Sequence, residues 1–220
     1  MTDLQIRTAV ITGQHSYDVP AFTRLFRVLP NVDAYVQTLD DFVADVGKAR
    51  DWYEVILFYN FHQGTPGDPE QEPWWGKGTR VALERLGQTE QGIVVLHHAL
   101  MAFREWSFWS DLVGIEERGQ GYHPDQRLSV HVEDPDHSIT RGLVDWAMTD
   151  ETYTINEPGP DSQLLLTTDH PDSMRSLAWT RAFGKARVFC CASGHGAQAF
   201  DNPHFRTVLS RGIGWAAHRL

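Results

Sequence analysis

Short, continuously apolar runs separated by amphipathic stretches are the feature that most restricts how this chain can fold. Four runs rich in β-branched and aromatic residues occur in the first half, at residues 8–12, 32–35, 55–59 and 93–97. Three stretches between or after them carry apolar residues at spacings of three and four, as helices packed on a sheet do, at residues 21–28, 79–86 and 102–112. This alternation predicts an α/β fold with a doubly wound, mostly parallel sheet covered on both faces.

The second half of the chain has a different rhythm. Five β-rich runs follow one another closely, at residues 128–132, 152–155, 164–168, 176–180 and 186–191. Their close spacing predicts antiparallel strands added at one edge of the sheet, and a last helix is expected over 204–218. Because no repeat or linker interrupts the 220 residues, we expect a single domain over 1–220.

Charge and hydropathy exclude several classes of partner. Lys and Arg number 19 against 29 Asp and Glu, a formal charge of −10, so the chain has no basic stripe for a nucleic-acid backbone. The apolar runs are far shorter than the roughly 20 residues that cross a bilayer. The amino terminus lacks the pattern of a secretory signal. We therefore expect a cytoplasmic protein with no nucleic-acid or membrane partner.

Cys190 and Cys191 are neighbours on an expected strand, where adjacent side chains point to opposite faces. They are poorly placed for a mutual disulfide, and no Cys-x-x-Cys pattern is present. We expect both to be small buried core residues.

Histidines follow three of the expected strands at their carboxyl ends, where open α/β sheets bind ligands. His15 follows the first strand, His97 and His98 end the fourth, and His195 follows the strand at 186–191. A lone histidine is more often structural than functional, but equivalent positions on three strands predict a shared cleft.

An acidic segment at 149–153 is the candidate partner of these histidines. Extended backbone would direct Glu151 and Tyr153 to one side and Asp150 to the other, so Glu151 and Tyr153 could face a ligand. The alternative is a solvated edge strand with surface charges. Trp74 and Trp75, in a Pro-rich loop at 64–78, either overhang the cleft or anchor the loop to the core.

Taken in series, several short motifs resemble the ThuA-like (trehalose utilisation) family, whose fold is similar to the flavodoxin-like class I glutamine amidotransferase domain. The resemblance covers nearly the whole chain. Its markers are Thr12-Gly13 with His15 and Asp18, Leu96-His97-His98-Ala99, Asp136-His137-Ser138, Asp150-Glu151-Thr152-Tyr153, Ala178-Trp179-Thr180-Arg181, Gly194-His195 and Arg211-Gly212-Ile213. One departure is Gly196, which stands where the family usually has an aspartate.

Glutaminase chemistry needs a cysteine nucleophile on the sharp turn after a strand, with a histidine base oriented by an acid. The turn here offers His97, His98 and Ala99, and Ala197 stands where the orienting glutamate of that fold would be. We therefore expect that the chain is not a glutamine amidotransferase.

Imidazoles with a carboxylate suit either proton transfer or a divalent metal such as zinc. We assign His98, Glu151 and His195 as catalytic candidates. The ligand-binding candidates are His15, Asp18, His97, Tyr153 and Trp75. The metal candidates are His15, His97 and His195, with Glu151 as a further ligand. Only one of His97 and His98 is included, because a regular strand would direct only one of two adjacent side chains into the cleft.

The resemblance implies a carbohydrate ligand and a pathway partnership with an oxidoreductase that makes 3-keto sugars. A ketone at C3 acidifies the hydrogen at C2, so the chain is predicted to act on an oxidised sugar or glycoside as a hydrolase, lyase or isomerase. A non-catalytic binding or regulatory protein on the same scaffold, and a metal-dependent hydrolase of other small molecules, are the alternatives. A homodimer is one assembly that a tryptophan-rich surface could support.

Overall fold

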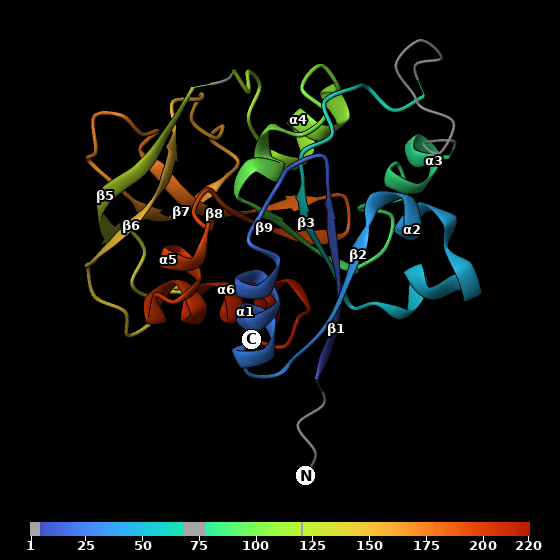
Figure 1. The fold of residues 1–220 in the computed structure, drawn as a ribbon, viewed down its shortest axis with the longest axis horizontal. Helices are drawn as coiled ribbons and strands as arrows, with labels where there is room; N and C mark the ends of the chain where they lie inside the picture. The colour runs from blue at the N-terminus through green and yellow to red at the C-terminus, as the bar shows by residue number, and fades with distance from the viewer. Residues whose placement is uncertain (1–4, 68–77, 120) are drawn as a thin grey trace.

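One mixed β-sheet organises the protein in the computed structural model, which describes residues 5–67, 78–119 and 121–220 (Figure 1). Its nine strands have the order β2-β1-β3-β4-β9-β8-β7-β5-β6. The bounds are β1 Ile6–Gly13, β2 Val32–Thr38, β3 Val55–Asn60, β4 Gly92–Leu96, β5 Tyr122–Val132, β6 Trp146–Tyr153, β7 Gln163–Thr167, β8 Ser176–Phe183 and β9 Ala186–Cys191.

The two halves of the sheet differ in strand direction. The pairings among β2, β1, β3, β4 and β9 are parallel, and those that join β9, β8, β7, β5 and β6 are antiparallel. The α/β class and the antiparallel additions were predicted, but half of the eight pairings in the described chain are antiparallel, so the sheet is mixed rather than mostly parallel.

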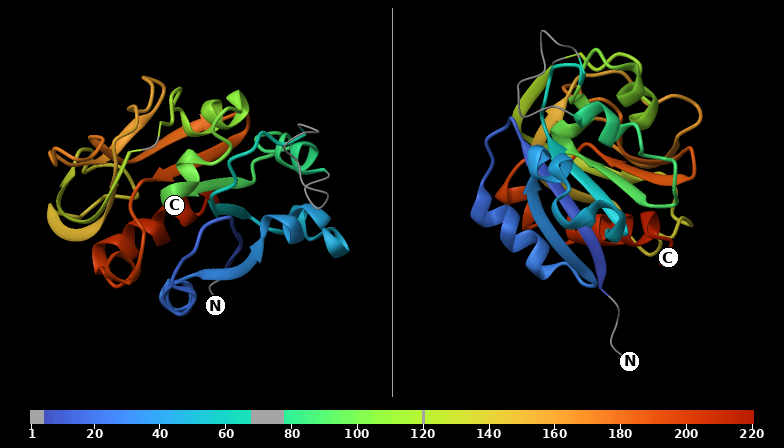
Figure 2. Two further views of the ribbon diagram at one scale, coloured as in Figure 1. Left: turned by 45° about the horizontal axis from the view of Figure 1, so that its top comes forward. Right: turned by 90° about the vertical axis from the view of Figure 1, so that its right-hand side faces the viewer.

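Side-chain alternation along each strand builds two cores on opposite faces of the sheet. In β3, every residue is buried, and Val55, Leu57 and Tyr59 enter one core while Ile56 and Phe58 enter the other. The first core packs against α1 Val19–Val28, α5 Ala197–Phe200 and α6 Pro203–Ala216. The second packs against α2 Leu39–Ala44, α3 Thr79–Leu83, the 3-10 helix η3 His97–Met101 and α4 Ser107–Val113. A further 3-10 helix, η1, spans Val46–Trp52. Two further views show helices on both sides of the sheet (Figure 2).

The helix expected over 102–112 begins later than predicted, at Ser107. Five carbonyl oxygens of residues 100–106 accept hydrogen bonds from the guanidinium of Arg118. Among them, only those of Phe103 and Trp106 also accept backbone N–H groups within the described chain. Arg118 is only 2% exposed, so one buried side chain holds this segment in an irregular path. The strand expected at 152–155 is the end of β6, which begins at Trp146.

Both cysteines are buried and free, as predicted. Among the helices of the described residues, none has the length and apolarity that a bilayer crossing requires.

The antiparallel half curls back over the parallel half. β6 stands four places from β9 in the strand order, which would separate them by about 19 Å in a flat sheet. Asp150 of β6 nevertheless accepts hydrogen bonds from the backbone directly after β9. This curl brings the end of β6 over the carboxyl ends of the parallel strands.

Candidate functional site

His97 is the first residue after β4 and turns the chain sharply. Its φ of 57° lies in the left-handed region, so the strand ends at Leu96 and the 3-10 helix η3 begins at once. The imidazole is fully buried, and its Nδ1 lies 2.8 Å from the carbonyl oxygen of Ala192. Because a carbonyl oxygen only accepts, Nδ1 carries the hydrogen, and Nε2 presents a lone pair toward the site.

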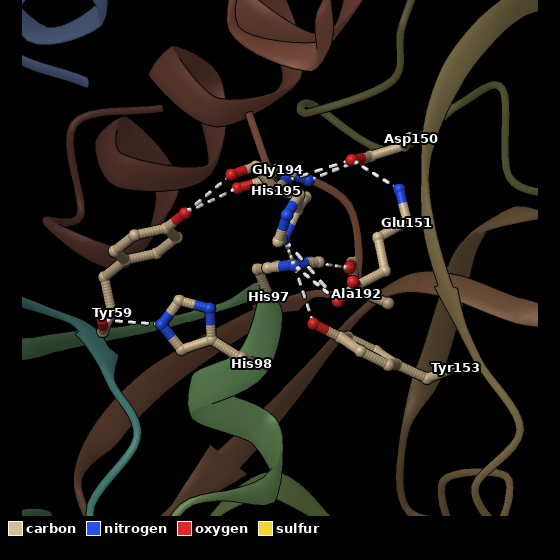
Figure 3. Close-up of polar contacts among 9 residues, drawn as sticks. All are labelled: Tyr59, His97, His98, Asp150, Glu151, Tyr153, Ala192, Gly194 and His195. Carbon is tan, nitrogen blue, oxygen red and sulfur yellow. Dashed lines mark hydrogen bonds and ion pairs between the residues drawn. The ribbon is translucent and has the colours of Figure 1, made fainter. Parts of the chain in front are cut away.

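Three side chains surround Nε2 of His97 (Figure 3). The hydroxyl of Tyr153 donates to it at 2.6 Å, and Nδ1 of His195 lies 3.1 Å away. Glu151 places Oε1 3.5 Å from both of these imidazole nitrogens. We call His97, Glu151, Tyr153 and His195 the histidine–glutamate cluster. It joins residues that follow β4 and β9 to two residues of β6.

Protonation in this cluster follows from burial and close partners. Burial by itself would raise the pKa of Glu151, but bonding to His97 and the nearby His195 and Tyr153 outweigh it and hold this pKa below its usual value. Burial and the adjacent Glu151 raise the pKa of Tyr153 far above its ordinary range. Glu151 is therefore a carboxylate at neutral pH, and Tyr153 remains an O–H donor.

Two residues that the sequence analysis did not assign hold the turn that carries His195. Asp150 accepts the backbone N–H groups of Gly194 at 2.6 Å and His195 at 3.0 Å, and that of Glu151 at 2.9 Å. Burial raises the pKa of Asp150, and these three donors oppose that rise by stabilising the carboxylate. Tyr59 donates its hydroxyl to the carbonyl oxygens of Gly194 and His195 at 3.0 and 3.2 Å.

Gly194 is required by this turn. Its φ is +118°, and a Cβ there would lie 3.1 Å from the ring of Phe205. Neither L-residue backbone preference nor the available space favours a side chain at this position.

A pocket of about 280 Å³ opens beside the cluster. Its lining residues are His15, Phe61, His98, Met101, Gly121, Tyr122, Glu151 and Tyr153. The His15 and His98 rings stack with centroids 4.1 Å apart. Burial lowers the pKa of both imidazoles, that of His98 to about 2, and Nε2 of His98 donates to the carbonyl oxygen of Tyr59 at 2.9 Å. His98 therefore stays neutral, which makes it a poor general acid or base.

The structure brings together six of the eight candidate site residues: His15, His97, His98, Glu151, Tyr153 and His195. Asp18 is not among the residues that line the pocket, and its carboxylate caps α1 by accepting the N–H of Ala21 at 2.9 Å. Trp74 and Trp75 lie outside the described residues. Both adjacent histidines reach the site, because they belong to η3 rather than to a regular strand.

Geometry selects Glu151 in place of His15 for a metal site. The ligand atoms of His97, Glu151 and His195 all lie within 4.8 Å of one another. A tetrahedral zinc ion with ligands at about 2.0–2.1 Å separates them by about 3.3 Å, close to the observed 3.1 and 3.5 Å. The Nδ1–H bond of His97 to Ala192 also fixes its tautomer as in a typical metal ligand. These three residues fit a divalent ion.

A family model for trehalose utilisation, named ThuA, matches residues 16–216. The chain belongs to the ThuA family. A search of curated proteins finds no match. Among solved structures, a ThuA-like protein from Parabacteroides merdae is 20% identical, with a TM-score of 0.73 over 97% of this chain and 90% of that chain. A cytoplasmic protein from Salmonella typhimurium is 11% identical, with a TM-score of 0.70 over 94% and 98% of the two chains.

This ThuA chain also shares its fold with amidotransferases. A glutamine amidotransferase from Thermotoga maritima is 9% identical, with a TM-score of 0.54 over 96% of this chain and 98% of that chain. In the present structure, the sharp turn after β4 carries His97, and both cysteines are buried within β9. Burial raises the pKa of both thiols, so neither is an activated nucleophile.

Proposed function

We propose that this ThuA protein acts in the cytoplasm on an oxidised sugar, a 3-keto sugar or glycoside, by acid–base chemistry at the histidine–glutamate cluster. One observation carries the proposal: Glu151 is ionised, reaches the pocket, and is backed by two imidazoles and a phenol. A carboxylate on a pocket wall with proton carriers behind it suits the removal of a hydrogen next to a ketone. The family description, trehalose utilisation, supports a carbohydrate as the substrate.

In the proposed reaction, Glu151 removes the proton from C2 of the sugar. The C–H electron pair moves into a C2=C3 double bond, and the C3 ketone oxygen takes the negative charge of the resulting enolate. When the enolate collapses, the ketone re-forms, a C1=C2 double bond forms, the C1–O bond breaks, and the departing oxygen takes up a proton. His195 suits this second transfer, because its ring is 41% exposed and its Nδ1 lies 3.5 Å from the carboxylate of Glu151. If the C1–O bond stays intact, reprotonation of the same enolate gives isomerisation.

Tyr153 and His97 prepare this step. Tyr153 lines the pocket and keeps its hydrogen, which is donated to Nε2 of His97 before substrate binds. Turned from His97 toward the substrate, this O–H would donate to the oxygen that gains negative charge. His97 is buried behind it and fixes the positions of Tyr153 and Glu151. A divalent ion held by His97, Glu151 and His195 would supply electrostatic stabilisation of the enolate.

The test is turnover of 3-keto glycosides, including the 3-keto derivative of trehalose, followed by chromatography of the released sugar and aglycone. Glu151→Gln is expected to lower the rate about 10²–10⁴-fold while the protein stays folded. Glu117→Gln is the matched control, because Glu117 is exposed and does not line the pocket. Metal analysis of the same preparations, with assays repeated after chelation, separates the metal-assisted route from the metal-free one.

Absence of turnover with every 3-keto glycoside, in metal-loaded and metal-free protein alike, would refute the enzymatic proposal. Retained ligand binding under those conditions would identify a binding protein on the same scaffold. The proposal includes a partner reaction, because an oxidoreductase must supply the 3-keto sugar.

A further inference from the structure

Two pocket-lining histidines each have one buried ring nitrogen without a hydrogen-bond partner within the described chain: Nδ1 of His98 and Nδ1 of His15. His98 is only 1% exposed, and its Nε2–H is committed to the carbonyl oxygen of Tyr59. Its Nδ1 is therefore an unprotonated acceptor. Burying an acceptor without a donor is unfavourable, so an occupant of the pocket that supplies a donor, a water molecule or the hydroxyl of a ligand, stabilises this wall.

The surroundings hold the two rings in a fixed arrangement. The His15 and His98 rings stack at an interplanar angle of 23°. Phe61 meets both edge-on, with centroids 5.6 Å from His15 and 5.7 Å from His98. The rings that carry the unpartnered nitrogens thus pack together as an aromatic wall of the pocket.

This arrangement disfavours a shared metal ion. Imidazole lone pairs lie in the ring planes, and the planes of two nearly parallel rings 4.1 Å apart do not converge on one point about 2.1 Å from both nitrogens. Two separate donors, one for each ring, satisfy the pair better. A hydroxyl group can donate to His98, and it can donate to or accept from His15 according to the tautomer of that ring.

We propose that His15 and His98 form a binding pair for two adjacent hydroxyl groups of a sugar. The inference rests on the proposed function for the carbohydrate nature of the ligand, and it adds which feature of the sugar is recognised. Tyr122, 67% exposed at the same pocket, offers an aromatic face to the ring of that sugar. Binding through this wall positions the sugar beside Glu151, which lines the same pocket.

The test measures binding of unoxidised probes, separately from turnover. Methyl α-D-glucopyranoside and its 2-, 3-, 4- and 6-deoxy analogues are titrated into the wild-type protein by calorimetry. Loss of either of two adjacent hydroxyls is expected to weaken binding about tenfold, which corresponds to about 1.4 kcal/mol. Loss of the other hydroxyls should change it less than about twofold.

Protein variants assign this effect to the histidines. His98→Gln keeps an N–H that can reach the carbonyl oxygen of Tyr59 but lacks the Nδ1 acceptor, and His15→Gln removes the second nitrogen at a more exposed position. In each variant, one of the two deoxy analogues that bind wild type about tenfold more weakly is expected to bind as well as the parent glycoside. His131→Gln is the matched control, since His131 lies on β5 and does not line the pocket.

Equal affinity for all analogues, no binding of the parent glycoside, or penalties unchanged in both variants would overturn the binding pair. So would stoichiometric zinc binding that is lost in His15→Gln and His98→Gln but kept in His97→Gln. If a 3-keto glycoside is turned over and any of these results is also obtained, only the proposed binding role of His15 and His98 is refuted, and the proposed reaction stands. If the deoxy analogues bind more weakly as expected but no 3-keto glycoside is turned over, only the proposed reaction is refuted.

Discussion

Arg118 offers the sharpest test of how the wall of the site is supported. Its guanidinium donates to the carbonyl oxygens of Leu100, Ala102, Phe103, Arg104 and Trp106. Burial lowers the pKa of Arg118 to about 10, which still leaves the group charged at neutral pH. No carboxylate forms an ion pair with it in the described residues, so its principal partners are backbone dipoles of the segment that follows the site histidines.

The cost of Arg118→Met can be worked out from these bonds. The carbonyl oxygens of Phe103 and Trp106 also accept backbone N–H groups, whereas for the other three no second donor is found within the described chain. At about 1 kcal/mol for each buried carbonyl left without a donor, the variant loses about 3 kcal/mol of stability. For a chain of this size, that corresponds to a fall in Tm of about 6–12 °C.

Differential scanning calorimetry measures this change. Arg118→Lys should recover little of it, because three donors on one nitrogen cannot span carbonyls spread over seven residues. Arg127→Met serves as the control, since Arg127 is an exposed arginine on β5. A fall in Tm no larger than that of Arg127→Met would refute the supporting role of Arg118.

Three further outcomes follow from the site. The lowered pKa of Glu151 contributes stability that is present above the unfolded pKa of 4.5 and lost as the pH falls through the folded pKa. The free energy of urea unfolding should therefore differ between wild type and Glu151→Gln more at about pH 7 than at about pH 3. An equal difference at both pH values would contradict this. Tyr59→Phe removes the hydroxyl bonds to Gly194 and His195 and should lower Tm by about 2–4 °C and slow turnover, and unchanged kinetics would show that the turn needs no such support. Any tightly bound zinc, measured by titration of metal-free protein, should be lost in His97→Gln and retained in His15→Gln, and the reverse pattern would move the metal site to His15.

Most of the strands were predictable, because short runs rich in β-branched and aromatic residues, bounded by turn residues, favour strands over helices. The run at 55–59 is apolar at every position, which fits a strand buried on both faces, and β3 has this burial. The parallel strands also predict that residues at their carboxyl ends meet, and His15, His97, His98 and His195 lie together.

What escaped sequence reasoning depends on single long-range contacts. In the sequence, Arg118 cannot be distinguished from a surface arginine. No periodicity indicates that its guanidinium is buried and donates to backbone carbonyl oxygens of the segment at 100–106. The sequence also does not indicate the left-handed backbone conformation at His97. The strand alternation assumed for this position therefore predicted, wrongly, that only one of the two adjacent histidines would reach the site. Asp150 was assigned to the opposite side from Glu151, and it does point elsewhere, but into the turn that carries His195.

Other expectations stay predictions. The keto-sugar reaction, the metal and the oxidoreductase partner are among them. The homodimer, expected from a tryptophan-rich surface, also stays a prediction.

The curl of the sheet gives the pocket two walls with separate origins. Its imidazoles stand on turns of the rigid parallel half, whereas Glu151 and Tyr153 come from the β5–β6 ribbon, whose pairing slips in register between His123 and Gln126. Insertions or substitutions in that ribbon can therefore shift the carboxylate relative to the histidines and leave the rest of the scaffold intact. Relatives with the same imidazoles could in this way be adapted to sugars of different size by remodelling one hairpin.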